Sequence, residues 1–130
     1  MREDVDWILE NCQVWAIVGL SDNPSRAAHG VARFLQQRGK KIVPVHPSAE
    51  TVHGEQGYAT LADIPFAVDV VDVFRRSEDA GQFADEAAEI GAKAVWFQLG
   101  VVDDAAYARA REAGLRMVMD VCPAIEWRSR

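Results

Sequence analysis

Three arginines in this chain lie at points where the pattern predicts the start of a helix. Arg26 ends the polar loop "GLSDNPSR", and Arg75 and Arg76 follow the apolar run "VDVVDVF". A cation near the positive end of a helix dipole is unfavourable unless an anion lies beside it. A hydrogen bond from an arginine to a phosphate contributes roughly 1.5–3 kcal/mol when partly desolvated. The positions of these arginines indicate a site for a small anion, with solvated surface arginines as the alternative.

The loop that carries Arg26 has one glycine, Gly19, where a dinucleotide-binding loop has the pattern Gly-x-Gly-x-x-Gly. Ser21 and Ser25 supply hydroxyl donors, and Pro24 suits the first turn of a helix. The free N–H groups at a helix start bind phosphate well. The loop therefore fits a phosphate group better than it fits a complete nicotinamide dinucleotide.

Five apolar runs predict the strands that position these loops. Most are nearly continuous in apolar residues, as expected of a parallel sheet covered on both faces. They are Val14–Gly19, Lys41–Val45, Val68–Val73, Ala94–Phe97 and Met117–Val121.

The segments between the runs predict helices. Gly39, Gly91 and Gly114 each precede a basic residue and an apolar run, which is typical of a helix that ends at a left-handed glycine. We expect an α/β fold with a Rossmann-like, doubly wound, five-stranded parallel sheet, for which 3-2-1-4-5 is the usual strand order. Val5–Cys12 predicts an additional N-terminal helix, and Thr60–Ile64 a short one. Ser77 is expected to cap the helix that follows the third strand.

Ligands of open parallel sheets bind beyond the carboxyl ends of the strands. The segments at those ends are "GLSDNPSR", "VHPS", "VFRRSE", "QLG" and "DVCPAIE". They contain no Ser-His-Asp order, Walker loop or metal-ligand spacing, so we expect no catalytic or metal-binding residues. Asp72 is expected to accept hydrogen bonds from backbone amides, and Cys122 to be a buried structural thiol that a thiol ligand could meet.

Composition and net charge limit the classes of protein and of binding partner that remain. The 130 residues are 49% hydrophobic and 26% charged, which fits one globular domain over residues 1–130. The net charge of −6 argues against nucleic acid and anionic membranes as partners. Two cysteines without Cys-x-x-Cys, and the acidic start "MREDVDWILENC", favour a cytoplasmic protein without a signal peptide.

From Val14 to Glu126 the chain resembles the bacterial coenzyme A-binding protein family, a stand-alone counterpart of the first domain of the succinyl-CoA synthetase α subunit. The resemblance lies in "VGLSDNPSR", "VARFLQQRGKKIVPVHP", "LADIPFAVDVVDVFRRSE", "GAKAVWFQLG" and "DVCPAIEW". It implies a coenzyme A site at the strand ends, with "GLS", Ser25 and Arg26 on the diphosphate, "VHP" beside the adenosine and "VFRRS" over the nucleotide. His46 departs from the asparagine usual in that family.

These considerations together predict a set of cofactor-binding residues. They are Gly19, Leu20, Ser21, Ser25, Arg26, Val45, His46, Pro47, Phe74, Arg75, Arg76, Gly100 and Cys122. The expected function is binding of coenzyme A or an acyl thioester, as a carrier or sensor without its own catalysis. The alternatives are an NAD(P)-binding oxidoreductase-like protein and a redox-responsive scaffold that uses Cys122. A homodimer and a complex with another protein both stay open.

Overall fold

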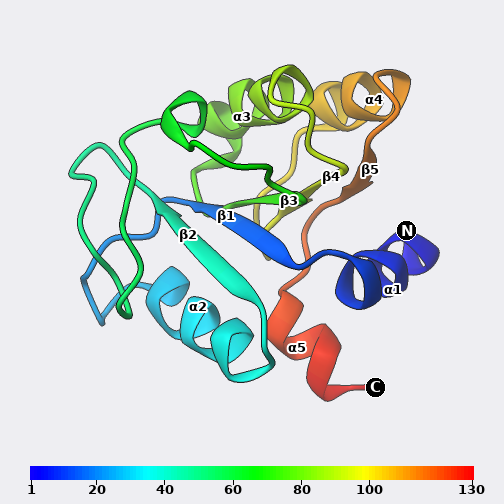
Figure 1. The fold of residues 1–130 in the computed structure, drawn as a ribbon. Helices are drawn as coiled ribbons and strands as arrows, with labels where there is room; N and C mark the ends of the chain where they lie inside the picture. The colour runs from blue at the N-terminus through cyan, green and yellow to red at the C-terminus, as the bar shows by residue number, and fades with distance from the viewer.

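The computed structural model describes residues 1–130 as a parallel sheet between two layers of helices (Figure 1). The strands are β1 (Val14–Val18), β2 (Lys41–Val45), β3 (Val70–Val73), β4 (Ala94–Phe97) and β5 (Arg116–Val118). The helices are α1 (Arg2–Asn11), α2 (Ala27–Gln37), α3 (Ser77–Glu89), α4 (Asp104–Glu112) and α5 (Pro123–Arg128), with a 3-10 turn η1 (Leu61–Asp63). The Rossmann-like α/β class, the five strands and the N-terminal helix are confirmed, and none of the helices is both long and apolar enough to cross a membrane.

The strands lie in the order β2-β1-β3-β4-β5, all parallel. The expected order, 3-2-1-4-5, has one more strand outside β2, whereas here β2 forms the edge. The reason is the segment between β2 and β3, which forms a loop with η1 and only an isolated bridge, Val45 to Tyr58, in place of an outer strand. In both orders the chain first adds strands on one side of β1 and then crosses to add the remaining strands on the other side of β1. The ligand crevice of such folds lies at this reversal.

Successive side chains of each strand point to opposite faces of the sheet, so the hydrophobic core is divided into two clusters, one on each face. Trp15 and Ile17 of β1 face the layer of α1, α2 and α5, whereas Ala16 and Val18 face α3 and α4 (Figure 1). Both faces of the sheet are therefore covered, which explains why the strand sequences are nearly continuous in apolar residues.

Three strands are shorter than expected, β1 by a single residue because it ends at Val18. β3 begins at Val70, although the Asp69 N–H still donates to the Val14 carbonyl at 3.0 Å; the Asp69 side chain also accepts hydrogen bonds from the N–H groups of Gln13 (2.9 Å) and Val14 (2.8 Å). β5 ends at Val118, and Asp120 beyond it has a φ of 62° that leaves the strand conformation.

The proline in β2 is compatible with the strand because of the edge position. The N–H of Lys41 donates to Gln13 and the carbonyl of Val45 accepts from Gly19, so the odd-numbered residues of β2 bond to β1. Pro44 therefore turns its nitrogen, which has no hydrogen to donate, away from the sheet. Its carbonyl oxygen accepts from the N–H of Tyr58 at 2.9 Å.

Two side chains behave differently from the sequence-based expectation. Asp72 accepts no hydrogen bond from any backbone amide, although it is completely buried in β3; the neighbouring Asp69 has that role. Ser77 does not cap α3, since Arg76 occupies the cap position. The Ser77 hydroxyl instead accepts from Val102 N–H (2.9 Å) and donates to the Gly100 carbonyl (3.3 Å), so it fixes the loop after β4.

Replacing Asp69 with asparagine should destabilise the protein at neutral pH. Burial alone would raise the pKa of Asp69, but the Val14 and Gln13 N–H groups and Lys93 outweigh it and lower the pKa. A carboxylate with a lowered pKa stabilises the fold above its unfolded pKa, and the effect disappears as pH falls through the folded pKa. We expect Asp69→Asn to cost about 1–2 kcal/mol at pH 7 in urea unfolding. The difference from wild type should shrink below about pH 4. Asp63→Asn, on the exposed η1, is the control; equal losses for the two variants would contradict this role.

Replacing Asp72 with asparagine should have the opposite pH dependence. Desolvation raises the pKa of Asp72 well above the ordinary range, so the folded protein holds a proton that the unfolded chain releases. The free energy of unfolding must then fall with rising pH between about pH 4, where an unfolded aspartate ionises, and the raised folded pKa. We expect the melting temperature of Asp72→Asn minus that of wild type to increase from pH 5 to pH 8. A difference that is constant over this range would show that Asp72 is ionised in the folded state.

Candidate functional site

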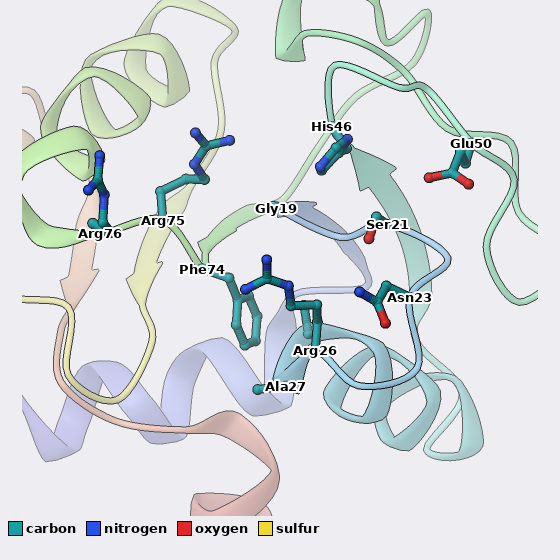
Figure 2. A pocket seen from close by; sticks show the side chains of 11 residues that line it. Gly19, Ser21, Asn23, Arg26, Ala27, His46, Glu50, Phe74, Arg75 and Arg76 are labelled. Atoms are coloured by element: carbon teal, nitrogen blue, oxygen red, sulfur yellow. The ribbon is translucent and has the colours of Figure 1, made fainter.

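A cavity of about 740 Å³ opens at the carboxyl ends of β1, β2 and β3, where the strand order reverses (Figure 2). Its walls are the loop from β1 to α2, the first turn of α2, the loop after β2, and the segment between β3 and α3. The residues predicted from the sequence that line it are Gly19, Ser21, Arg26, His46, Phe74, Arg75 and Arg76.

Six predicted residues do not line the cavity. Leu20, Val45 and Cys122 are buried in the core, and Cys122 packs in the cluster beneath α2 and α5. Ser25 bonds through both its N–H and its hydroxyl to the Asn23 side chain. The two others, Pro47 and Gly100, are exposed in loops outside the lining.

Four lining residues were missed by sequence reasoning: Asn23, Ala27, Ala28 and Glu50. The Asn-Pro-Ser sequence does carry a signal for the first, because an asparagine that accepts from the N–H two residues later forms a common turn; here Asn23 Oδ1 and Ser25 N are 3.0 Å apart. Glu50 gave no signal, since it lies in the loop well after β2 and only the folded loop brings it to the cavity.

The first turn of α2 presents unsatisfied backbone donors to this cavity. The cap residue of α2 is Arg26, which makes no side-chain capping bond, and the first turn contains no acidic residue. The first N–H of α2 with an acceptor is that of His29, which donates to the Arg26 carbonyl at 3.1 Å; those of Ala27 and Ala28 have none. A helix start with free N–H groups and a positive dipole end attracts anions.

Two of the three arginines are free to bind a ligand. Arg26 and Arg75 form no ion pair or side-chain hydrogen bond, and they approach the cavity from α2 and from the end of β3 (Figure 2). Arg76 is 77% exposed and pairs with Asp79 at 3.2 Å and with Glu78 at 3.4 Å on its own helix. Arg26 and Arg75 therefore supply the unneutralised positive charge of the site.

Gly19 forms the centre of the cavity wall. Its φ of 98° lies in the left-handed region, and a Cβ atom at this position would lie 3.3 Å from Cβ of Phe74. Its N–H donates to the carbonyl of Val45 at 2.8 Å, which holds the loop against the end of β2. A residue with a side chain would strain the turn and press against Phe74.

The β2 side of the cavity carries a fixed imidazole and a carboxylate. The Ser48 N–H donates to Nδ1 of His46 at 3.1 Å, so the neutral ring carries its proton on Nε2. The Ser48 hydroxyl lies 2.8 Å from the same nitrogen and 3.0 Å from a Glu50 carboxylate oxygen. This wall offers a donor at His46 and an acceptor at Glu50, a pair suited to neutral polar groups such as hydroxyls or a base edge.

Comparison with known proteins places the chain among coenzyme A-binding domains. A family model described as "CoA binding domain" matches residues 13–128. The chain is 36% identical over 121 residues to the uncharacterized protein YneT of Bacillus subtilis, covering 93% of this chain and 90% of that one. The solved structure of a hypothetical protein from Pyrococcus horikoshii superimposes with a TM-score of 0.93 at 35% identity, over 99% of this chain and 91% of that one.

A more distant relative is part of a larger enzyme. Over 102 residues the chain is 28% identical to the alpha subunit of the ADP-forming acetate–CoA ligase II of Pyrococcus furiosus, which covers 78% of this chain but 21% of the subunit. The family resemblance seen in the sequence is thus confirmed by the match over nearly the whole chain. With this fold and this extent of similarity, the chain belongs to the CoA binding domain family.

Proposed function

We propose that the cavity binds coenzyme A, and that the first turn of α2 holds its diphosphate. The observation that carries the proposal is the convergence of the free Ala27 and Ala28 N–H groups with the unpaired Arg26 and Arg75 on one cavity. Each of these features is unfavourable in the absence of an anion, because the helix dipole and the arginines carry the same sign. A diphosphate satisfies all of them at once.

The remaining walls fit the other parts of the nucleotide. In this proposal Gly19 and Ser21 contact the diphosphate. His46 and Glu50 contact the adenosine through the polar atoms described above. The membership in the CoA binding domain family supports the choice of coenzyme A over other nucleotides. The similarity to a subunit named for acetate–CoA ligase supports it as well.

An NAD(P) site is the second candidate. A carboxylate after the second strand grips the ribose in many such sites, and Glu50 does bring one to the cavity. However, the loop after β1 lacks the second and third glycines of a dinucleotide fingerprint, and the first turn of α2 is built from alanines. We therefore favour coenzyme A, and nicotinamide cofactors serve as the competing ligands in the test.

We further propose that residues 1–130 act as one binding unit, a carrier or sensor of coenzyme A or its thioesters. The cavity lining contains no cysteine and no paired nucleophile and base, since His46 accepts from Ser48 outside the lining. The partner in this proposal is the small molecule itself. A redox role for Cys122 is less favoured, because its side chain lies in the core and does not line the cavity.

Calorimetric titration with coenzyme A tests the proposal directly. We expect coenzyme A to bind more tightly than NAD⁺ or NADP⁺. Arg26→Ala or Arg75→Ala should each weaken coenzyme A binding at least about 10-fold, since a charged hydrogen bond contributes roughly 1.5–3 kcal/mol. Arg76→Ala should change affinity less than about threefold, because that guanidinium already pairs with Asp79 and Glu78.

The control for charge is Arg33→Ala with Arg109→Ala, two exposed arginines outside the cavity. This double variant removes as much charge as Arg26→Ala with Arg75→Ala and should bind like wild type. No binding at millimolar coenzyme A, or tighter binding of a nicotinamide cofactor, would refute the proposed function.

Substitution of Gly19 tests the turn separately from the charges. Gly19→Ala places a Cβ at a φ of 98° and 3.3 Å from Phe74, so we expect a stability loss of about 1–3 kcal/mol and at least tenfold weaker coenzyme A binding. Gly30→Ala is the matched control, because nothing lies within 4 Å of its Cβ position in α2. That variant should gain up to about 1 kcal/mol and keep its affinity. Thermal unfolding with and without ligand measures both; equal affinities for the two variants would contradict the assigned place of Gly19.

A further inference from the structure

Two buried side chains at the ends of β3 and β4 have polar atoms without partners. Both carboxyl oxygens of Asp72, which has 0% exposure, and Oε1 of Gln98, which has 8%, accept no hydrogen bond. An unpartnered buried polar group lowers the stability of the folded state. Natural proteins retain such groups mainly where function requires them. Neither side chain lines the open cavity.

The strand register places both groups next to Phe74. The Phe74 N–H donates to the Val18 carbonyl at 2.9 Å, which continues the β1–β3 pairing, so Phe74 lies on the same sheet face as Asp72, about 6.6 Å further along the strand. The Gln98 N–H donates to the Val73 carbonyl at 3.1 Å, which continues the β3–β4 pairing and sets Gln98 beside Phe74.

Phe74 is the residue that these two groups share with the cavity. It is half-buried, it lines the cavity, and it packs against the core cluster beneath α2. On its β1 side lies Gly19, which has no side chain to hold the ring in place (Figure 2). Phe74 is therefore the residue that lies next to both the cavity and these two buried groups.

We propose that Asp72 and Gln98 form an inner subsite that takes the amide-bearing arm of the ligand when Phe74 turns aside. This inference rests on the proposed function, because the arm of coenzyme A beyond its diphosphate carries two amides and a thiol. Amides both donate and accept, and so do a carboxylic acid and the glutamine side chain. Burial raises the pKa of Asp72, which favours the protonated form that can donate.

The test compares coenzyme A with 3′-phospho-ADP, its nucleotide portion without the arm, by calorimetry on the full chain. We expect wild type to bind coenzyme A at least tenfold more tightly than 3′-phospho-ADP. Asp72→Val and Gln98→Leu should each reduce this ratio at least threefold and leave 3′-phospho-ADP affinity unchanged within twofold. Asp72→Asn keeps donor and acceptor atoms, so its ratio of coenzyme A affinity to 3′-phospho-ADP affinity should stay close to that of wild type. Gln82→Leu, on the exposed face of α3, should have the same ratio as wild type.

Stability gives a second readout. Asp72→Val removes an unpartnered carboxyl from the core, so its melting temperature should equal or exceed that of wild type while the ratio falls. An unchanged ratio in the folded Asp72→Val and Gln98→Leu variants would overturn the inner subsite. Equal wild-type affinity for coenzyme A and 3′-phospho-ADP would overturn it as well, and the proposed nucleotide site would stand. Absence of binding by both ligands would overturn both proposals.

Discussion

The arrangement of the site depends on one electrostatic constraint: the positive end of α2 lies beside two arginines that form no ion pair with any carboxylate of the chain. Ala27 and Ala28 leave their N–H groups free, and Arg26 and Arg75 have no acidic partner, although the chain carries a net charge of −6. Arg76 shows the contrast, because acidic residues of α3 neutralise it. The strand order produces this convergence. After β2 the chain crosses to the other side of β1, so β3 pairs with β1 and the carboxyl ends of the two strands lie together.

Two local features near the cavity reduce the stability of the fold, and a role in ligand binding would explain why the chain has them. The uncapped start of α2 and the unpartnered Asp72 each cost free energy in the fold. Of the five α-helices, only α4 has a side-chain cap, and a partly buried carboxylate elsewhere in the chain does have partners. Asp103 caps α4 by accepting from Ala106 N–H, and Asp69 accepts from two backbone N–H groups. What distinguishes α2 is the place of its uncapped first turn, which lines the cavity together with Arg26 and Arg75.

Much of the fold was predictable because local patterns determine it. The glycines at positions 39, 91 and 114 all adopt positive φ at helix ends, as their position before a basic residue and an apolar run indicates. The strand order could not be predicted from the sequence, since it depends on whether the segment after β2 forms another strand. For the site, the strand-end rule found Arg26, Arg75 and His46. It could not find Glu50, which only the folded loop brings to the cavity, or the lack of partners at Asp72, which depends on side-chain packing from several elements.

The most direct test of the central claim is a titration of ¹⁵N-labelled protein with coenzyme A, followed by amide chemical shifts. If a diphosphate sits on the first turn of α2, the largest changes should fall on the amides of Gly19, Ala27 and Ala28, three residues that line the cavity. Inorganic pyrophosphate should move the same α2 amides at higher concentration. Large changes confined to other surfaces, such as the groove beside Lys41 and Phe66, with the α2 amides unmoved, would contradict the account.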